Sequence, residues 1–456
     1  HEQGLARTRL QVKPKNLVLA RGVPPVSLAC MWLLDQFLAR VIRNGRLIVT
    51  DHDGKERHYG PGQDDPMRIR FTHPKAAGHI ARHPQLGAGE AYMWGWLIVE
   101  PPHDIRDFVL FVTANGKAQG AGGMFRPKSP LRRMANRVIA ALDGFNERDA
   151  AKRNVAHHYE LGRKFYELFL DEDRQYTMAY FRDPETSLER AQLDKKAQIA
   201  AKLCLEPGSA SGMRILDIGC GWGGLALYLN RHFGCEVLGV SLAPDQVAFA
   251  RERAEAAGVA DKVKFEVIDY RDVAGRFDRI TSVGMIEHVG ARNYDQYFGK
   301  TRDLLADDGI MLTHTIGRRK PGRTDAWTRK YIFPGGYIPA MSELVGSLER
   351  TGWEIGDIEV LRYHYALTLA EWYRRTCLHE AEIKAMFDDR LFRMWQFYLA
   401  GAEQAFRNGG MVNFHIQSVR RRDALPMTRD YIGEQSARLR AADTAPEWHL
   451  ARDAAE

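Results

Sequence analysis

A short apolar segment that ends in a glycine-rich turn constrains the fold of this chain more than any other feature. The segment Ile215-Leu216-Asp217-Ile218 is followed at once by Gly219-Cys220-Gly221-Trp222-Gly223-Gly224. Glycine is needed in such a turn because a side chain would keep a ligand away from the backbone, and the start of a following helix offers free N–H groups. The pattern predicts a buried strand, a ligand-binding turn and a helix, which together form the first unit of an α/β domain.

Strands and helices alternate after this turn. Strands are predicted at 213–218, 236–240, 263–268, 277–283 and 309–315, and helices at 244–257 and 294–305, with longer helical stretches at 340–350 and 369–407. Alternation at this spacing predicts a central sheet of parallel type that is covered by helices on both faces.

The chain has 456 residues, which is too long for one ordinary core, so more than one domain is expected. A helix at 26–42 and strands at 45–50 and 67–72 predict a small N-terminal α+β domain, and we assign residues 1–125 to it. A connector rich in glycine leads into a linker at 126–150. The α/β domain is assigned to 151–432, and the polar residues 433–456 to a tail that is expected to fray.

The chain is moderately basic, with 65 Lys and Arg against 58 Asp and Glu and a net charge of +7. Such a surplus favours an anionic partner, although charge that serves solubility explains it equally well. The basic residues are dispersed along the chain, which argues against a nucleic-acid partner.

The five cysteines form no CxxC pair and lie near no histidine cluster, so no metal site is predicted and a reducing cytosol is expected. No apolar run reaches the roughly 18 residues that a membrane-spanning helix requires. If the protein acts on a membrane, we expect it to approach from the aqueous side.

The glycines alone do not select a cofactor, since Gly219 to Gly224 also fits the GxGxxG of dinucleotide-binding folds. Two neighbouring features do. Asp217 precedes the first glycine by two residues, and the second strand ends at Val240-Ser241 without the acid that would bind the ribose of NAD. Together they resemble motif I of the Rossmann-like class I methyltransferases, although the last glycine, Gly223, comes one residue early. The resemblance implies S-adenosylmethionine as the cofactor.

In methyltransferases of this kind the glycine turn holds the methionine moiety of the cofactor, and the next two loops meet the ribose and the adenine. The resemblance therefore implies the following cofactor-binding residues: Tyr159, Tyr176, Thr177, Asp217, Gly219, Gly221, Gly223, Ser241, Leu242, Gln246, Asp269, Tyr270 and Arg271. Helix capping is the alternative role for Ser241.

Several further segments look like signatures of the cyclopropane fatty acid synthases. They are His158-Tyr159-Glu160-Leu161, Gln175–Phe181, Ser282–Gly290, His314–Gly317, Lys330–Gly336 and Glu371-Trp372-Tyr373. The resemblance covers roughly residues 150–425 and is far more specific than any single motif. Gly87 to Trp96 is similar to the N-terminal domain of the bacterial enzymes, which the shorter mycolic acid cyclopropane synthases lack, so phospholipid acyl chains are the favoured substrate.

The resemblance implies transfer of a methylene from S-adenosylmethionine to the cis double bond of an unsaturated phospholipid, which gives a cyclopropane fatty acid. The family is understood to hold bicarbonate as the base, and its implied ligands are the side chains of Glu287, His314 and Tyr365 with the backbone amides of Met178 and Ile316. An acid, an imidazole and a phenol suit a small polar anion, because His and Tyr can donate while Glu shares a proton. The resemblance also implies a homodimer in which the N-terminal domain, residues 1–125, helps the enzyme to meet the bilayer. With the basic charge, it predicts peripheral binding to anionic lipids at the cytoplasmic face of the membrane.

The sequence departs from the family pattern where Met178 occupies the place of a cysteine, and a second family cysteine is replaced near Ala402. Methionine forms no thiolate, so catalysis by a thiol is excluded at residue 178. A set of aromatic residues is expected to wall an acyl tunnel, with core packing as the alternative for about half of them. The set is Tyr159, Tyr176, Tyr180, Phe181, Phe333, Tyr337 and Trp372.

Two other functions stay open at this point. A related lipid C-methyltransferase would leave a methyl or methylene branch instead of a ring, and loss of the base cluster would favour it. A lipid-binding protein without activity would keep only the fold, and the intact glycine turn argues against it.

Overall fold

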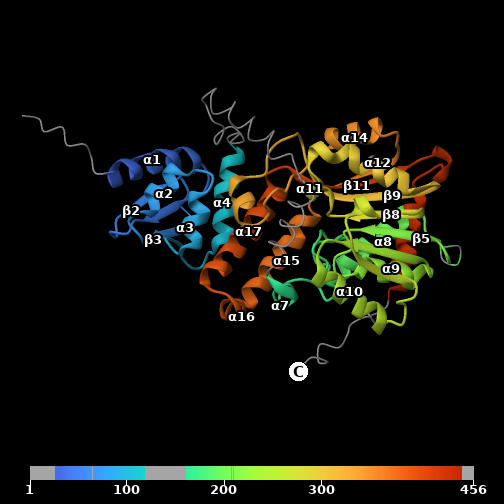
Figure 1. Ribbon diagram of the computed structural model, residues 1–456. Coiled ribbons are helices and arrows are strands. Elements are labelled where there is room, and N and C mark those ends of the chain that lie inside the picture. Colours follow the sequence, from blue (N-terminus) through green and yellow to red (C-terminus); the bar gives the residue numbers. More distant parts are fainter. Residues whose placement is uncertain (1–25, 64, 119–160, 207, 209, 444–456) are drawn as a thin grey trace, which may run out of the picture.

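The computed structural model describes residues 26–63, 65–118, 161–206, 208 and 210–443. Figure 1 shows two sheets, each with its own helices, joined by a layer of helices that includes α4 (Ile105–Ala118), α15 (His364–Leu378) and α17 (Asp389–Arg407). The linker predicted for 126–150 and the predicted cofactor-binding residue Tyr159 lie outside the described residues.

The smaller sheet has the strand order β2-β1-β3-β4. Its strands are β1 (Leu47–Thr50), β2 (Glu56–Tyr59), β3 (Met67–Phe71) and β4 (Leu97–Val99), and its helices are α1 (Val26–Val41), α2 (Ala76–Arg82), α3 (Gly87–Met93) and α4. Buried and exposed residues alternate along β3, from Met67 to Phe71, because one face of the sheet packs on the helices. The predicted helix and two strands are confirmed, whereas residues 116–118, which were predicted to begin a glycine-rich connector at 116–128, belong to α4.

The larger sheet has seven strands in the order β10-β11-β9-β8-β5-β6-β7. Five of them run parallel: β5 (Arg214–Ile218), β6 (Glu236–Ser241), β7 (Val263–Val267), β8 (Phe277–Val283) and β9 (Leu305–Arg318). β11 (Met411–Val419) lies antiparallel between β9 and β10 (Glu354–Leu361). The predicted sheet of parallel type is thus confirmed.

Helices cover both faces of this sheet, because neighbouring residues of each strand point to opposite sides. Ile215 packs with α8 (Leu188–Lys202), α9 (Gly224–Phe233) and α10 (Pro244–Ala256). The next residue, Leu216, packs with α12 (Tyr294–Leu304) and α14 (Met341–Arg350). A strand buried on both faces explains the unbroken apolar run before the glycine turn.

Two regions differ from the sequence-based expectation. The helical stretch predicted at 369–407 is divided into α15, α16 (Glu380–Met386) and α17. Of the tail predicted to fray at 433–456, residues 433–442 instead belong to α18 (Asp430–Ala442), which packs against α8 and buries Ile432 and Leu439, and residues 444–456 lie outside the described residues. A few apolar residues at helical spacing are therefore enough to hold this polar segment in place.

The two sheet-bearing parts meet along α17, which packs against α3 and α4. The guanidinium of Arg106 in α4 donates to the buried carboxylate of Glu403 in α17, with its Nε 2.6 Å from Oε2. Glu90 in α3 is buried and accepts from Lys330 Nζ at 2.7 Å. These paired charges fix α3 and α4 against the helices that wall the cavity described below. In the part of the chain that the structure describes, every helix is too short or too polar to cross a bilayer.

Candidate active site

A cavity of about 410 Å³ lies at the carboxyl ends of the parallel strands. Its wall includes Gly219 after β5, Ser241 at the end of β6, Asp269 after β7 and Gly284 after β8. Loops at this edge of a parallel sheet are where open α/β folds bind their ligands. The strands thus bring together four segments that are distant in the sequence.

The glycine turn lies in this wall through Gly219 and Gly221, which have φ values of +83° and +54°. No atom lies within 4 Å of a Cβ built on Gly221, so the turn leaves open space for a ligand there. Gly223, which was also predicted to bind the cofactor, is not among the residues that line the cavity. A Cβ on Gly223 would lie 2.8 Å from Ala250 Cβ and from Phe265 Cζ, so this glycine permits α9 to pack closely.

Asp217, at the end of β5, is a buried carboxyl group in the cavity wall. Its Oδ1 accepts from Thr281 Oγ1 at 3.3 Å, whereas Oδ2 has no hydrogen-bond partner among the described residues. Burial raises the pKa of Asp217 to about 7. A buried carboxyl oxygen without a donor fits a ligand that brings one, such as the ammonium group of the methionine moiety of S-adenosylmethionine.

The loops after β6 and β7 contribute the remaining residues that were predicted to meet the cofactor. Ser241, Leu242, Gln246, Asp269, Tyr270 and Arg271 all line the cavity, as do Tyr176 and Thr177 from the segment before α8. Ser241 Oγ accepts from the amide of Ala243 at 3.2 Å, which is a local turn contact. Arg271 Nε donates to Asp269 Oδ1 at 2.8 Å, so this carboxylate is already oriented by its neighbour.

Glu287, His314 and Tyr365 line the same cavity as the glycine turn. Glu287 lies on the short helix α11 (Ile286–Val289), His314 on β9 and Tyr365 on α15. Burial raises the pKa of Glu287 to about 7, and its Oε2 has no hydrogen-bond partner among the described residues. Three elements therefore bring an acid, an imidazole and a phenol to one wall, as the sequence predicted.

Burial also fixes the protonation of the other two groups. It lowers the pKa of His314 to about 3, so the imidazole is neutral at physiological pH. It raises the pKa of Tyr365 well above the usual value, so the phenol keeps its proton. A neutral imidazole and a phenol can each donate one hydrogen bond, so this set of side chains suits an anionic ligand.

Met178 and Ile316, whose amides were predicted to bind the same anion, also lie in the cavity wall. The Ile316 amide donates to Glu287 Oε1 at 2.6 Å. Met178 is fully buried in the core cluster that includes Tyr365 and Trp372. The Ile316 amide is thus directed at the predicted site, where the carboxyl group of Glu287 accepts its hydrogen bond.

The rest of the wall is largely apolar. Three helices supply part of it: Trp327 from α13 (Ala326–Tyr331), Leu369 from α15, and Phe397, Tyr398 and Ala402 from α17. Of the aromatic residues predicted to wall an acyl tunnel, Tyr176, Phe333 and Tyr337 line the cavity. Tyr180, Phe181 and Trp372 do not, and Trp372 is buried and stacks on Tyr176 with ring centroids 5.1 Å apart. Core packing is their role, which was the stated alternative.

Sequence reasoning missed three polar residues in and beside this wall. Lys195 and Asn413 line the cavity, and His415 lies behind it, with its Nε2 2.9 Å from His314 Nδ1. Lys195 lies on a helix where a lysine ordinarily faces water, and Asn413 and His415 lie on a strand that was not predicted. The alternation of polar and apolar residues from Met411 to Val419 was the available signal.

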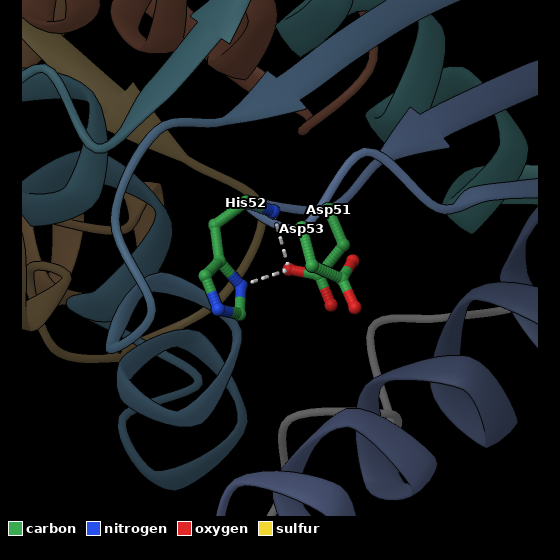
Figure 2. A group of neighbouring side chains, drawn as sticks. All are labelled: Asp51, His52 and Asp53. Carbon is green, nitrogen blue, oxygen red and sulfur yellow. Dashed lines mark hydrogen bonds and ion pairs between the residues drawn. The ribbon is translucent and has the colours of Figure 1, made fainter.

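Within the described part of the chain, one group of side chains outside the cavity has the spacing of metal ligands. Asp51, His52 and Asp53 lie in the turn between β1 and β2, and Figure 2 shows them at its tip. His52 and Asp53 are exposed, Asp51 Oδ1 accepts from the His52 amide at 2.8 Å, and Asp53 Oδ2 pairs with Lys55 at 2.8 Å. These contacts are those of a hairpin turn, and we assign no metal to it.

Comparison with known proteins identifies the family. The family model described as mycolic acid cyclopropane synthetase matches residues 146–416. The chain is 36% identical to the cyclopropane-fatty-acyl-phospholipid synthase of Escherichia coli K12 over 345 residues, which cover 75% of this chain and 85% of that enzyme. It is 39% identical to a probable fatty acid methyltransferase of Pseudomonas putida over 271 residues, or 57% of this chain and 67% of that protein.

A solved structure agrees with this assignment. The crystal structure of the mycolic acid cyclopropane synthase CmaA1, complexed with S-adenosylhomocysteine and CTAB, superimposes with a TM-score of 0.55 and 28% identity. The match covers 59% of this chain and 97% of that protein. The chain belongs to the cyclopropane synthase family of S-adenosylmethionine-dependent methyltransferases.

Proposed function

We propose that this enzyme transfers a methylene group from S-adenosylmethionine to the cis double bond of unsaturated phospholipid acyl chains, giving cyclopropane fatty acids. The observation that carries the proposal is the composition of one cavity. A glycine turn, a cluster of acid, imidazole and phenol, and an apolar aromatic wall all border the same space. An alkene is a weak nucleophile and needs all three: a bound methyl donor, a base and a site without water.

The bound cofactor supplies an electrophilic methyl group, and the protein orients it. Asp217 and the backbone at Gly219 and Gly221 would hold the methionine moiety. Ser241 and Gln246 would hold the ribose, and Asp269 and its neighbours the adenine. The apolar residues of α13, α15 and α17 would hold the acyl chain and keep water from the reacting carbons, since water would quench a carbocation. Aromatic faces such as those of Tyr176 and Phe333 would stabilise positive charge on the chain.

We further propose that Glu287, His314 and Tyr365, with the amides of Met178 and Ile316, hold a bicarbonate ion. Such an ion supplies a base for the proton that leaves the new methyl group. Two features make these residues suitable for a bicarbonate ion: side chains that can donate hydrogen bonds and the unpaired carboxyl oxygen of Glu287. Tyr365 keeps its proton and can donate, and Glu287 Oε2 is buried without a partner among the described residues. His314 is neutral and has one N–H; His415 Nε2 lies 2.9 Å from its Nδ1 and Asn413 Nδ2 lies 3.4 Å from its Nε2, so it would donate to the ion only with its proton on Nε2. Glu287 has a pKa near neutrality, so it can share a proton with the anion.

The phospholipid substrate requires contact with a membrane. We propose that the enzyme binds anionic lipid surfaces peripherally at the cytoplasmic face of the membrane and that it acts as a homodimer. The net charge of +7 supports attraction to anionic headgroups.

A second candidate is a lipid C-methyltransferase that leaves a methyl or methylene branch. Two observations favour it. Met178 stands where the family pattern has cysteine, and the relative from Pseudomonas putida is described as a probable fatty acid methyltransferase. The acid, imidazole and phenol in the cavity favour the ring product, since ring closure needs a base beside the methyl group.

The test is incubation of the purified enzyme with methyl-labelled S-adenosylmethionine and vesicles of unsaturated phospholipid, followed by mass spectrometry of the released fatty acids. The proposal predicts label in a saturated three-membered ring at the former double bond. Label in a methyl or methylene branch would establish the second candidate instead. Omitting bicarbonate from degassed buffer should slow ring formation, and restoring it should recover the rate.

A further inference from the structure

We propose that Lys195 binds the carboxylate of the cofactor's methionine moiety and, together with Asp217, makes the site selective for an α-amino acid. The inference rests on the proposed function only through its cofactor, S-adenosylmethionine. No catalytic step is assigned to Lys195. Its amine would bind and position the cofactor, and the carboxylate that pairs with it would be part of the cofactor.

Lys195 is a buried lysine in the cavity wall, with a residue exposure of 1%. Its Nζ donates to Gln175 Oε1 at 2.7 Å and to Thr177 Oγ1 at 2.8 Å. Both acceptors are neutral and both belong to cavity-lining residues. An ammonium group has three N–H donors, so these two contacts leave one donor for a ligand.

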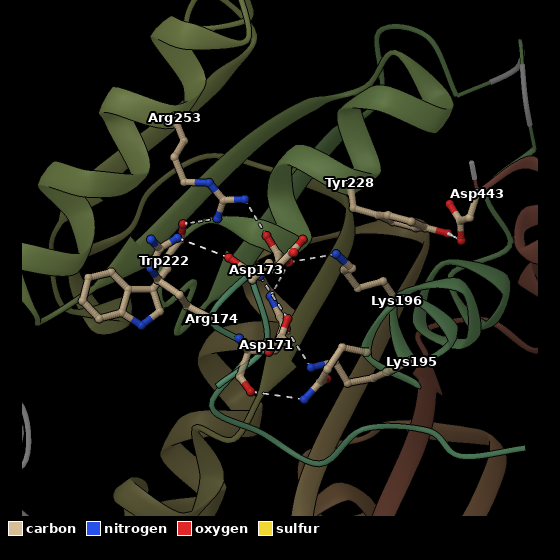
Figure 3. A network of polar contacts seen from close by, with 12 residues as sticks. Asp171, Asp173, Arg174, Lys195, Lys196, Trp222, Tyr228, Arg253 and Asp443 are labelled. Atoms are coloured by element: carbon tan, nitrogen blue, oxygen red, sulfur yellow. Dashed lines mark hydrogen bonds and ion pairs between the residues drawn. The ribbon is translucent and has the colours of Figure 1, made fainter. Parts of the chain in front are cut away.

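The charge of Lys195 is not matched by a direct ion pair. Among the described residues, no carboxylate oxygen forms a salt bridge with its Nζ. The neighbouring lysine behaves differently, since Lys196 Nζ lies 2.8 Å from Asp173 Oδ2, and Asp173 also accepts from Arg253. Figure 3 shows the two amines directed to different groups, with Lys196 in the network around Asp173. A buried ammonium without a bonded anion is costly to keep, so a functional reason for it is expected.

An incoming carboxylate would supply the missing anion. Burial lowers the pKa of Lys195 to about 7, and the nearby carboxylates of Asp171, Asp173 and, to a smaller extent, Asp217 oppose that shift without forming a salt bridge with its Nζ. Asp217 lacks a hydrogen-bond donor in the same way that Lys195 lacks a bonded anion, because its buried Oδ2 accepts from no donor among the described residues. The methionine moiety carries an ammonium and a carboxylate on one carbon, so it can complete both groups at once. Neither group is satisfied by the other, since no hydrogen bond joins Lys195 to Asp217.

The hydrogen bond to Thr177 positions the Lys195 amine within the site. Thr177 lies in the segment that was predicted to bind the cofactor, and its Cγ2 lies 3.1 Å from the position of a Cβ on Gly284, in the loop after β8. The Lys195 amine bonded to Thr177 is therefore held beside the loops that surround the cavity.

The experiment compares the binding of two ligands by isothermal titration calorimetry with the full chain. The ligands are S-adenosylhomocysteine and its decarboxylated analogue, which keeps the amine and the adenosine. Because a hydrogen bond between charged groups contributes about 1.5–3 kcal/mol, the wild-type protein is expected to prefer S-adenosylhomocysteine by about 10- to 100-fold. In Lys195→Met the preference should fall to within about threefold, and Lys195→Arg should retain most of it.

Lys196→Met is the matched control, because it removes another buried amine, 5% exposed against 1% for Lys195, one residue along α8 that does not line the cavity. Its preference between the two ligands should equal that of the wild type. If Lys195 only braced Gln175 and Thr177, Lys195→Met would weaken both ligands by the same factor, and that result would overturn the proposal. A wild-type protein that binds both ligands equally would overturn it without any variant. If only the proposed function is wrong, the results differ: the preference for S-adenosylhomocysteine over its decarboxylated analogue is as predicted, but the enzyme forms no ring product.

Discussion

His314 and His415 face each other across the antiparallel pair β9 and β11, with His415 Nε2 2.9 Å from His314 Nδ1. Both rings are buried, and burial lowers the pKa of both. The pair is therefore neutral at physiological pH, and one nitrogen of the contact donates while the other accepts. Through this contact β11 orients a side chain that lines the cavity, although His415 itself does not line it.

Replacing His415 is expected to damage the site through His314. In His415→Leu the Nδ1 of His314 loses its partner in a buried position, which should lower the free energy of unfolding by about 1–3 kcal/mol and reduce turnover. His415→Gln keeps a side chain that can donate and accept a hydrogen bond, so this variant should retain most of the stability and most of the turnover. Urea unfolding and product formation measure the two effects. Equal behaviour of the Leu and Gln variants would show that the contact does not orient His314.

Glu287→Gln and Tyr365→Phe are expected to lower kcat strongly while leaving cofactor affinity close to that of the wild type. The first removes an acid and the second a hydrogen-bond donor from the proposed base site, and such groups contribute about 10²- to 10⁴-fold to rate. The cofactor is proposed to bind at other residues of the cavity wall, those of the glycine turn and the loops after β6 and β7. Calorimetry with S-adenosylhomocysteine should therefore give an affinity within a few-fold of wild type. A large loss of affinity would mean that these side chains bind the cofactor.

Glu287 should also make stability depend on pH. Its pKa is raised by burial from 4.5 to about 7, so between these values the folded protein holds a proton that the unfolded chain has lost. The contribution of Glu287 to the free energy of unfolding is therefore fully present below about pH 4.5. It falls as the pH rises toward 7 and does not change further above pH 7. Glu287→Gln cannot ionise and should gain stability relative to the wild type as the pH rises, by on the order of 1–3 kcal/mol.

Urea unfolding of both proteins at pH 5 and pH 8 measures this difference. Other titrating groups are shared by the two proteins and cancel in the comparison. The variant that loses turnover is thus expected to be the more stable protein at pH 8. A stability difference that is the same at both pH values would show that Glu287 is ionised in the folded protein throughout.

Binding to vesicles should weaken as salt is added. The proposed attraction between the basic chain and anionic headgroups acts through water, and the screening length falls from about 10 Å at 0.1 M salt to about 3 Å at 1 M. Sedimentation with vesicles that contain anionic phospholipid, at the two salt concentrations, measures the effect. Vesicles of neutral phospholipid are the control and should bind weakly at both. Binding that is insensitive to salt would contradict the charge-based proposal.

The elements that carry the cofactor site could be predicted because they follow simple patterns. β5 is buried on both faces and ends at Ile218, directly before Gly219, so its apolar run and the glycine turn are visible in the sequence. The family resemblance then supplied Glu287, His314 and Tyr365, which no spacing rule connects. They come together only because α11, β9 and α15 meet at one edge of the sheet.

The residues that sequence reasoning missed share a physical cause. Along β11 the polar residues Asn413, His415 and Gln417 are as buried as Phe414 and Ile416. Polar residues in alternation suggest a face in water, whereas here they face a polar interior. The sequence of α8 is misleading in the same way, because a helix with several charged residues is expected to be exposed to solvent. Lys195 and Lys202 are nevertheless buried and bonded, and only the fold reveals their partners.

The two glycines Gly221 and Gly223 should respond differently to the same change. Both have positive φ values, so alanine is strained at either position. At Gly223 the new methyl group would also meet Ala250 and Phe265 at 2.8 Å, so Gly223→Ala should lose more stability, by about 1–3 kcal/mol beyond the strain. At Gly221 no atom lies within 4 Å, and Gly221→Ala should instead project into the cavity and weaken cofactor binding. Thermal unfolding and calorimetry separate the two outcomes. If Gly223→Ala weakened binding more than Gly221→Ala at equal stability, Gly223 would be part of the cofactor site after all.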